Sequence, residues 1–276
     1  MKNQKVWYVT GASKGLGLNL VKLLLSNGYK VAATSRNSSA FDKLVAEYPG
    51  NLLPLAVDIT RDESVKQSIS QTIGNFGKLD VVVNNAGYSL VGSIEELSDL
   101  EFRETIDVNL FGTVNTIRAA MPHFRKQGSG HFINISSNAG YIGFANAGSY
   151  NAAKFAVVGI SEALAEESKA FGVKVTVVAP GQFRTSFMDS LAFAENKIAV
   201  YKLAEAEKMW REYSGTQRGD PAKLAQVLID LANHPNPPLH LLAGPDTYQL
   251  VTEHRQKERQ EFADWKDVTL STDFDQ

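Results

Sequence analysis

A tyrosine and a lysine stand four positions apart in the stretch SYNAAK, residues 149–154. The surrounding residues, AGSYNAAKFAVVGISEALAEE, predict a helix, so Tyr150 and Lys154 share one face, one turn apart. A free phenol ionises near pH ~10, and a neighbouring ammonium lowers that pKa. The pair therefore predicts a group that moves protons near neutral pH. A surface pair without chemistry has the same spacing, so other parts of the chain must decide.

A glycine-rich turn follows the first expected strand, residues 5–11. The stretch TGASKGLG continues from that strand into an expected helix over residues 18–26. Its glycines, Gly11, Gly15 and Gly17, allow a tight turn and a close backbone approach to a dinucleotide pyrophosphate, which a helix N-terminus also favours. An ordinary strand–helix turn is the alternative interpretation.

The end of the second expected strand, residues 29–35, bears on the choice of dinucleotide. An acidic residue at this place would bind the ribose 2′-hydroxyl of NAD. This chain has Ser35 and Arg36 instead, in the stretch TSRN. Arg36 can pair with a 2′-phosphate, and Lys14 in the glycine-rich turn adds a second positive charge. Both residues predict NADP(H), with a solvated loop arginine as the alternative.

The elements that must position these residues alternate between strand and helix along the chain. Further strands are expected at residues 51–59, 79–87, 130–137, 173–180 and 239–244, and further helices at 41–48, 62–76 and 100–126. This rhythm predicts a doubly wound parallel sheet (a Rossmann fold) in a three-layer α/β/α arrangement. We expect one domain over residues 1–250, with a substrate lid at about 184–220 and a C-terminal helical tail at 251–276.

Composition excludes several classes of function. The 276 residues have a formal net charge of -2, which gives no basic field for nucleic acid. The chain has no cysteine, so disulfides and thiolate chemistry are excluded, and its five histidines show no metal-ligand spacing. No run reaches the ~18 apolar residues of a membrane span, and the N-terminal stretch lacks a signal-peptide pattern. We therefore expect a cytoplasmic protein without a metal.

Several short motifs occur together in a fixed order. They are TGASKGLG, NNAG at 84–87, Asn109, Ser137 thirteen residues before Tyr150, YNAAK, and PG at 180–181. This set resembles the classical short-chain dehydrogenase/reductase family over about residues 5–250, and TGxxxGxG is the typical glycine motif of that family. The second strand, the lid and the tail further resemble a bacterial subgroup close to hydroxysteroid and retinol dehydrogenases.

The resemblance implies a role for each of four catalytic residues. Tyr150 would be the general acid/base, and Lys154 would lower its pKa and bind the nicotinamide ribose. Ser137 would hold and polarise the substrate oxygen. Asn109 would position a water that links Lys154 to solvent. Taken singly, Ser137 also fits a strand-end serine bonded to the backbone, and Asn109 a polar residue that bends a helix.

The resemblance also implies a cofactor site and a reaction, the transfer of a hydride between NADP(H) and a carbonyl or alcohol carbon. Within this site Asp58 would contact the adenine amine, and Thr185 the nicotinamide amide or the pyrophosphate. The implied cofactor-binding residues are Thr10, Gly11, Ser13, Lys14, Gly15, Leu16, Gly17, Ser35, Arg36, Asp58, Ile59, Asn85, Ala86, Gly87, Tyr150, Lys154, Pro180, Gly181, Phe183 and Thr185.

The positions that face the substrate in this family are apolar or aromatic in this chain. Beside Ser137 and Tyr150 they include Tyr88, Tyr141, Phe144, Phe187 and Met188. We expect a hydrophobic ketone, aldehyde or secondary alcohol, although the same residues could pack the lid against the body. The family also implies a homodimer or homotetramer.

Two other functions stay open. One is an NADPH-binding regulator with little turnover, against which the four intact catalytic residues argue. The other is a reductase of carrier-bound 3-oxoacyl chains, for which Arg125 and Lys126 could dock an acidic carrier.

Overall fold

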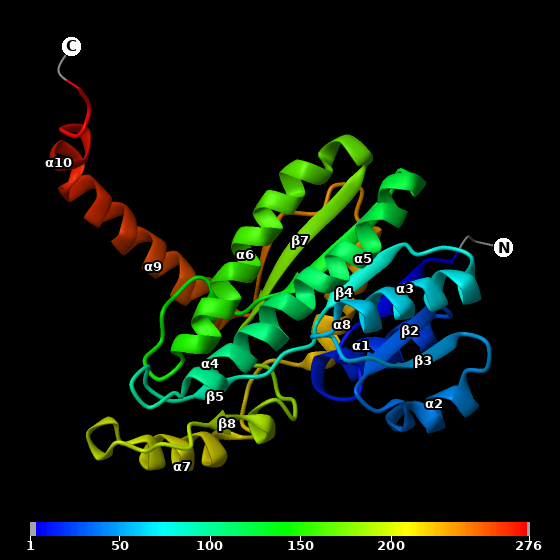
Figure 1. Ribbon diagram of the computed structural model, residues 1–276, viewed down its shortest axis with the longest axis horizontal. Coiled ribbons are helices and arrows are strands. Elements are labelled where there is room, and N and C mark those ends of the chain that lie inside the picture. Colours follow the sequence, from blue (N-terminus) through cyan, green and yellow to red (C-terminus); the bar gives the residue numbers. More distant parts are fainter. Residues whose placement is uncertain (1–3, 275–276) are drawn as a thin grey trace.

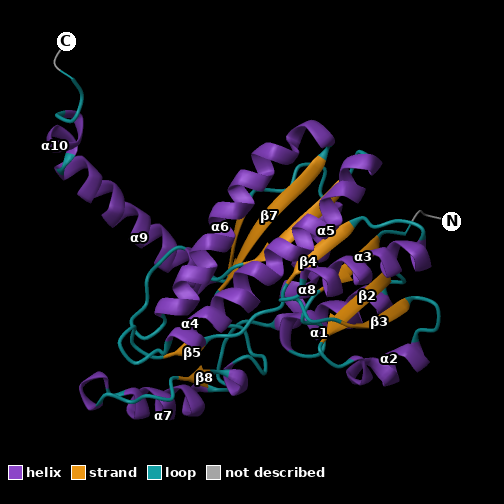
Figure 2. Ribbon diagram, in the orientation of Figure 1, coloured by secondary structure: helices purple, strands orange, loops and turns teal. Residues whose placement is uncertain are grey.

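The computed structural model describes residues 4–274 and is built around a seven-stranded parallel sheet (Figures 1 and 2). The strands lie in the order β3-β2-β1-β4-β6-β7-β9. Their bounds are β1 Val6–Val9, β2 Lys30–Ser35, β3 Leu52–Ala56, β4 Val81–Asn84, β6 Gly130–Ile135, β7 Val173–Pro180 and β9 His240–Ala243. The expected doubly wound α/β fold in a single domain is confirmed.

Helices cover both faces of this sheet (Figure 2). Helices α1, α2 and α8 contribute to the core on one face, and α3, α5 and α6 to the core on the other. The principal helices are α1 Gly15–Ser26, α2 Asp42–Glu47, α3 Asp62–Phe76, α4 Asp99–Ile106, α5 Gly112–Gln127, α6 Gly148–Ser168, α7 Leu203–Tyr213, α8 Pro221–Asn233, α9 Pro245–Asp264 and α10 Lys266–Leu270.

The strand residues divide between the two cores with the period of two that a pleated strand requires. Along β1, Trp7 and Val9 enter the core beside α1 and α8, whereas Val6 and Tyr8 enter the core beside α3 and α5. All four side chains are fully buried. Burial on both faces explains why the strands read as continuous apolar runs in the sequence.

The site-forming end of the sheet is set by strand order. Strand β1 pairs with β2 on one side and with β4 on the other, so the chain reverses its direction of winding at β1. In open parallel sheets, ligands bind beyond the carboxyl ends of the strands at such a switch point. The glycine-rich turn after β1 and the NNAG stretch after β4 meet at this place.

Several boundaries differ from those expected. The long helix expected over 100–126 is continuous, but a π-helical turn, Asp107–Phe111, separates α4 from α5. The strand expected over 79–87 spans only Val81–Asn84, because the chain leaves the sheet to meet the glycine-rich turn. The expected boundary at residue 250 falls inside α9, which forms a protruding C-terminal arm with α10 (Figure 1). Residues 275 and 276 of the expected tail lie outside the described residues.

The segment between β7 and α8 forms a small module of its own beside the sheet. Its strand β8, Ala192–Phe193, pairs in parallel with β5, Leu90–Val91, and its helix α7 lies next to this ribbon (Figure 1). Apolar side chains close it into a separate cluster: Val91, Leu97, Leu191, Phe193, Ala194, Leu203 and Trp210. Lid residues therefore pack mainly against one another and against the β5 region.

Within residues 4–274, none of the helices combines the length and the apolar character that crossing a bilayer demands.

Candidate active site

Helix α6 carries Tyr150 and Lys154 against the carboxyl end of β6. Lys154 is 4% exposed, and its Nζ donates a hydrogen bond to the Ile135 carbonyl at 3.0 Å. The Lys154 Nζ lies 5.5 Å from the centroid of the Tyr150 ring. The two side chains thus share a helix face, as their spacing predicts, with the ammonium over the ring rather than in solvent.

A tight contact fixes the distance between α6 and the turn after β6. A methyl group at Gly140 would lie 2.7 Å from the Lys154 carbonyl oxygen and would also collide with Ser136 Oγ. The Ser136 hydroxyl itself donates to the Lys154 carbonyl at 3.0 Å. Neither Ser136 nor Gly140 was predicted from the sequence, although each lies within three residues of Ser137.

The π-helical turn places Asn109 beside Lys154. Its Nδ2 donates to the Tyr88 carbonyl at 2.9 Å and to the Thr105 carbonyl at 3.0 Å, and the residue is fully buried. Its Oδ1 has no partner among the described residues. A methyl group at Gly87 would collide with this Oδ1 and lie 3.4 Å from the Lys154 Nζ. An unused acceptor and an ammonium therefore border the same space, an arrangement that suits a bridging water.

Ser137 lies two residues beyond the end of β6 and caps the short turn that follows. Its Oγ accepts from the Ala139 amide at 3.2 Å and donates to Asn138 Oδ1 at 3.0 Å. The structure therefore gives Ser137 the local backbone contact of an ordinary strand-end serine. The same hydroxyl acts on Tyr150 and favours a lower pKa of its phenol. Ser137 is thus placed both to hold the turn and to face the tyrosine.

Burial is the main influence on the pKa values of Tyr150 and Lys154. Burial raises the pKa of Tyr150 to about 12, and the Ser137 hydroxyl opposes this rise only in part. Burial also lowers the pKa of Lys154 to about 8. The lowering of the phenol pKa by Lys154 stays a prediction, since in this structure loss of water stabilises the neutral form of both groups. Tyr150 is accordingly a protonated phenol at neutral pH.

The glycine-rich turn is bonded directly to the NNAG stretch. Thr10 Oγ1 accepts from the amides of Asn85 and Ala86 at 2.9 and 3.0 Å. A methyl group at Gly11 would lie 2.7 Å from the Ala86 Cα, and one at Gly17 would lie 2.6 Å from the Gly11 carbonyl oxygen. The glycines are required because two backbone segments and a helix meet here without room for side chains.

The start of α1 fits a phosphate group. Lys14, at the N-cap, makes no side-chain cap, and the first turn holds no acidic residue. Gly15 has φ 58°, and a methyl group there would meet only Thr185, at 3.8 Å and beyond. The first amides of the helix and the open space over Gly15 thus form a cradle that an anion can enter.

The end of β2 presents positive charge. Arg36 is exposed and forms no ion pair with a carboxylate of residues 4–274, whereas the Ser35 hydroxyl donates to the Asn37 carbonyl. Lys14 Nζ donates to Ser190 Oγ of the lid at 2.6 Å. Lys14 thereby joins the glycine-rich turn to the lid, a contact that the sequence did not predict.

The remaining implied cofactor residues lie at the same edge of the sheet. Asp58 Oδ1 accepts from the Thr60 amide at 3.0 Å, and Ile59 packs under Gly112. The Gly181 amide donates to the Ala243 carbonyl at 2.9 Å, and Thr185 Oγ1 accepts from the Phe187 amide at 3.2 Å. Residues placed nearby by the backbone, with partly exposed or packed side chains, are Ser13, Leu16, Pro180 and Phe183.

The predicted substrate-facing residues do not form one group. Phe187 lies over the site, with its ring centroid 6.3 Å from that of Tyr150, and Met188 follows it in the lid. Tyr88 turns toward α4, where its hydroxyl accepts from Thr105 Oγ1 at 3.4 Å. Phe144 is 38% exposed.

Tyr141 does not join the substrate-facing group. It is 5% exposed and packs in an apolar cluster with Val158 and Val251. Its hydroxyl is 2.7 Å from Nδ1 of His240 on β9. The assignment of Tyr141 to the substrate is therefore corrected, because the turn after Ser137 directs this side chain to the far side of α6 and β7.

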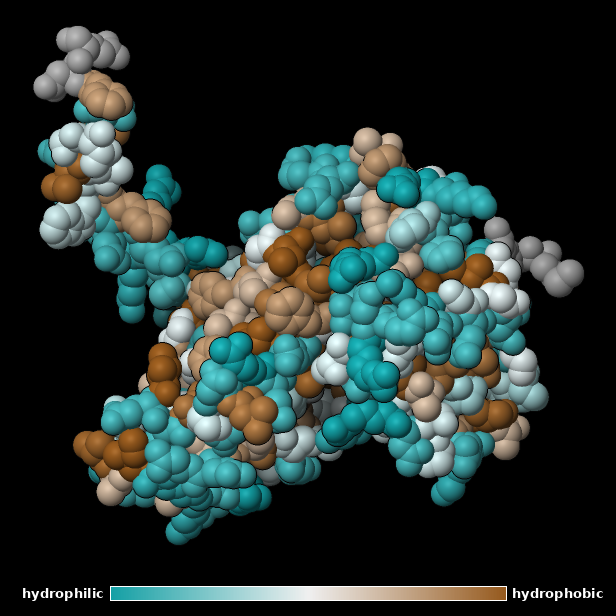
Figure 3. Space-filling model, viewed as in Figure 1, coloured by the Kyte–Doolittle hydropathy of each residue, from teal (hydrophilic) through white to brown (hydrophobic). Residues whose placement is uncertain are grey.

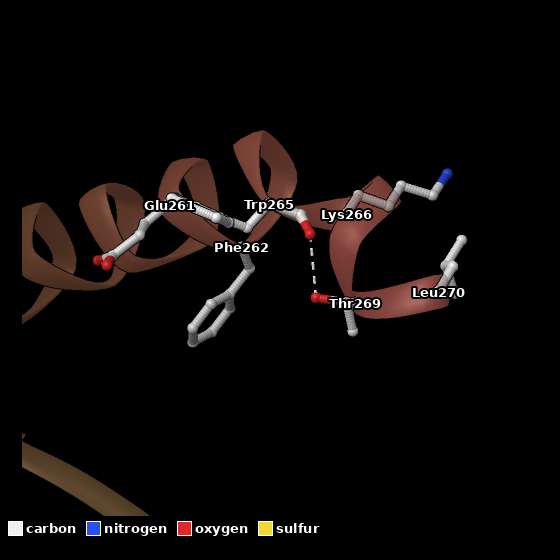
Figure 4. Close-up of a pocket in the computed structure, with 6 residues that line it drawn as sticks. All are labelled: Glu261, Phe262, Trp265, Lys266, Thr269 and Leu270. Atoms are coloured by element: carbon white, nitrogen blue, oxygen red, sulfur yellow. Dashed lines mark hydrogen bonds between the residues drawn. The ribbon is translucent and has the colours of Figure 1, made fainter. Parts of the chain in front are cut away.

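A hollow elsewhere on the molecule is remote from these residues. It lies on the protruding arm and is lined by Glu261, Phe262, Trp265, Lys266, Thr269 and Leu270 (Figure 4). The bend between α9 and α10 forms it, and Thr269 Oγ1 donates to the Trp265 carbonyl there at 3.0 Å. Among residues 4–274, no group of three or more His, Asp or Glu side chains is placed to hold a metal ion.

A family model described as short chain dehydrogenase matches residues 5–196. The chain belongs to this family. It is 34% identical over 97% of its length to Oxidoreductase BOA17 of Botryotinia fuckeliana, covering 99% of that protein. It is 36% identical to a 3-ketodihydrosphingosine reductase of Bacteroides thetaiotaomicron, with 86% and 87% of the two chains covered. An L-fucose dehydrogenase of Bos taurus is 34% identical, with 83% of each chain covered.

Solved structures show the same family resemblance. A short-chain dehydrogenase from Streptomyces avermitilis has a TM-score of 0.90 and 35% identity, with 98% of this chain and 100% of that chain covered. ElxO, solved with NADP bound, has a TM-score of 0.73 and 29% identity, with 87% and 96% covered. The resemblance to classical short-chain dehydrogenases is therefore confirmed, and the protein is an oxidoreductase of this family.

Proposed function

We propose that the protein is an NADP(H)-dependent oxidoreductase that interconverts a carbonyl group and an alcohol. The observation that carries the proposal is the convergence of Tyr150, Lys154 and Ser137 with the unpartnered Asn109 Oδ1, next to a glycine-rich phosphate cradle. A regulator that only binds a dinucleotide would have no use for a buried phenol and ammonium on one helix face.

The residues of this chain divide the work of the reaction. A bound nicotinamide supplies or accepts the hydride. Tyr150 donates a proton to the substrate oxygen during reduction. A phenol is protonated at neutral pH, and burial raises the pKa of Tyr150 further, to about 12. Ser137 orients and polarises that oxygen. Lys154 and Asn109 border the space through which a water returns a proton to the phenol.

The choice of NADP(H) rests on charge at two positions. Arg36 is exposed at the end of β2, where an acidic residue would favour NAD, and Lys14 adds a second cation at the glycine-rich turn. ElxO, a structural relative, was solved with NADP bound, which supports the same cofactor for this chain. We expect exchange of Arg36 for aspartate to reverse the preference by repelling a 2′-phosphate.

The substrate is proposed to be hydrophobic because of the lid. Phe187 faces the Tyr150 ring, and Met188 lies beside it on the same short turn. Among the relatives, one is a reductase of 3-ketodihydrosphingosine and another a dehydrogenase of L-fucose, so family membership alone leaves the substrate open. The apolar lid favours a ketone, an aldehyde or a secondary alcohol with a hydrophobic body.

A homodimer or homotetramer is part of the proposal. Figure 3 shows apolar surface over α5 and α6, the helices beside Asn109 and Tyr150. Phe111, directly before α5, is 49% exposed, and Phe155, on α6, is 42% exposed, and exposed apolar side chains of this size are typical of a surface that meets a partner. The molar mass in solution, measured by light scattering, would be a multiple of 30.2 kDa.

The test of the proposed function is the oxidation of NADPH and of NADH, followed by absorbance, with a panel of apolar ketones and aldehydes. The panel includes an acetoacetyl thioester, which probes the carrier-bound alternative. We expect turnover with NADPH to exceed turnover with NADH, and Arg36→Asp to invert the ratio. Binding of NADPH without turnover of any member would favour the regulator. Equal use of both cofactors, unchanged by Arg36→Asp, would contradict the choice of NADP(H).

A further inference from the structure

A buried carboxylate holds the far end of the lid. Glu96, in the loop before α4, is 1% exposed. Its Oε2 accepts from the Ser93 amide at 2.9 Å, within its own loop. Its Oε1 accepts from the Ile198 amide of the lid at 2.9 Å. One oxygen therefore closes the loop, and the other binds a segment about a hundred residues away in sequence.

A second carboxylate repeats this division. Glu101 Oε2 accepts from the amide and the hydroxyl of Ser98 at 2.8 and 2.7 Å, which forms a capping box at the start of α4. Its Oε1 accepts from the Glu195 amide of the lid at 3.0 Å. The two glutamates together bind the lid backbone at positions 195 and 198.

These contacts keep both groups charged. Hydrogen bonds from backbone amides hold the pKa of Glu96 below its usual range despite burial, and the Ser98 and Glu195 donors do the same for the pKa of Glu101. Burying a carboxylate is costly unless donors surround it, so removal of either set of donors would be strongly unfavourable. A glutamine cannot replace either residue fully, because its NH₂ group would face an amide N–H.

Apolar contacts and a two-stranded ribbon support the same junction. The Ala192 amide donates to the Ser89 carbonyl at 3.0 Å, and the Ala194 amide to the Val91 carbonyl at 2.9 Å. A methyl group at Gly92 would lie 2.7 Å from the Ala194 Cβ, so the two segments approach closely. The junction has the specific packing of a docked unit.

The junction is connected to the candidate site from both sides. The lid segment that carries Phe187 over Tyr150 continues directly into β8 and then into residues 195–198. On the other side, α4 begins beside Glu101 and continues into the π-helical turn that holds Asn109. A shift of the lid would therefore move the apolar wall over Tyr150.

We propose that Glu96 and Glu101 form a carboxylate clasp that fixes the lid and so sets the size of substrate accepted over Tyr150. They are positioning residues, since they act through the lid and touch no reacting atom. The effect on substrate size rests on the proposed function, whereas the clasp itself does not.

The clasp is tested by hydrogen–deuterium exchange of the intact protein. The probes are the amides of Glu195 and Ile198, in Glu96→Gln, in Glu101→Gln and in the control Glu104→Gln, an exposed residue on the same helix α4. Loss of a hydrogen bond to a charged acceptor is expected to speed exchange of the lid peptide about tenfold or more in the first two variants. The control should match the wild type. Unchanged exchange in both clasp variants would overturn the proposal.

Glu101→Gln keeps the test decisive if Glu96→Gln does not fold, because Glu101 is only partly buried and its capping oxygen can be retained by glutamine. Exchange of the Glu195 amide alone then decides. Faster exchange confined to this amide supports the clasp, and an unchanged exchange rate contradicts it.

Kinetics test the consequence for substrate size. With NADPH, acetophenone and the bulkier 2-acetylnaphthalene serve as probes. We expect KM to rise about tenfold in the clasp variants, with the ratio of the two KM values approaching one, while kcat changes much less. A loss of kcat at unchanged KM would contradict a positioning role through the lid. Failure of the wild type to reduce either probe would count against the proposed function, and the exchange experiment would still decide the clasp.

Discussion

The catalytic face of α6 and the lid that covers it are built in different ways. Lys154 is bonded to β6 and is 4% exposed, and the turn at Gly140 leaves no room between α6 and the Ser136–Ser137 stretch. The lid instead rests on a two-stranded ribbon, a small apolar cluster and two carboxylates that bind its backbone. The proposed reacting groups thus lie on the densely packed sheet and on α6, and the proposed substrate wall belongs to a separately docked module.

This difference indicates how the two properties of the enzyme can change independently. Chemistry depends on residues held by the sheet, so substitutions there should affect turnover or stability. We propose that selectivity depends on the lid, so substitutions there should affect KM. Substitutions in the two regions test whether turnover and substrate selectivity can change independently.

Apart from loss of the Tyr150 hydroxyl, the largest effect is expected from Gly87→Ala. The added methyl group would collide with Asn109 Oδ1 and crowd the Lys154 Nζ, so turnover should fall on the order of 100-fold. Gly143→Ala is the matched control, because a methyl group there meets nothing within 4 Å. The measurement is kcat with NADPH and an apolar ketone. Similar kcat values for both variants would show that the space beside Lys154 is unimportant.

The burial of Lys154 predicts a pH dependence of stability. Its pKa is lowered from 10.5 to about 8 in the folded protein. Between these values the unfolded chain keeps a proton that the native state has lost, so native stability rises with pH in this window. The free energy of unfolding of the wild type, minus that of Lys154→Met, should increase from pH 8 to 10.5 by roughly 3 kcal/mol. Urea unfolding across this range is the measurement, and a flat difference would contradict the assigned burial.

Asn134→Ala tests the polar link between the sheet and α6. Asn134 is fully buried, accepts from Asn84 Nδ2 and donates to Ser161 Oγ on α6, both at 2.8 Å. Its removal leaves Asn84 Nδ2 without its acceptor and takes one donor from Ser161 Oγ, which still donates to the Val157 carbonyl, so unfolding free energy should fall by about 2 kcal/mol. The urea midpoint should drop with an unchanged slope. A loss below about 0.5 kcal/mol would mean that this link contributes little to the frame.

The smallest effect is expected in the lid. Phe187→Ala removes the ring that faces Tyr150 and should raise KM for an apolar ketone about fivefold, with kcat nearly unchanged. Phe262→Ala, 72% exposed on the arm, is the control and should match the wild type. A larger effect on kcat than on KM would mean that Phe187 contributes to the chemical step, and it would contradict the separation of turnover from substrate selectivity.

Much of the sheet and of the site beside it was predictable because the sequence patterns that indicate them are local. The glycines after β1, the four-residue spacing of Tyr150 and Lys154, and the alternation of apolar strands with helices can all be read within a few residues. They predicted the parallel sheet. The family resemblance placed the glycine-rich turn and the NNAG stretch in one cofactor site, and Thr10 joins the two by hydrogen bonds.

The contacts of the lid and the pKa of Tyr150 were harder to predict from the sequence. Glu96 and Glu101 bind backbone amides about a hundred residues away. Every residue except proline has a backbone amide N–H, so no residue type in the sequence indicates such a contact. Tyr141 was misplaced because the turn that redirects it depends on tertiary packing against His240. The burial that raises the pKa of Tyr150 to about 12 follows from the whole fold and could not be read from the residues around Tyr150.

The most direct test of the central claim is the effect of Tyr150→Phe on the NADPH-dependent reduction of a ketone that the wild type accepts. Loss of the proton donor should reduce kcat on the order of 1000-fold. Binding of NADPH, followed by its fluorescence, should change little because the ring remains in place. Turnover in Tyr150→Phe within about tenfold of the wild type would contradict the assignment of Tyr150 as the acid that protonates the substrate oxygen.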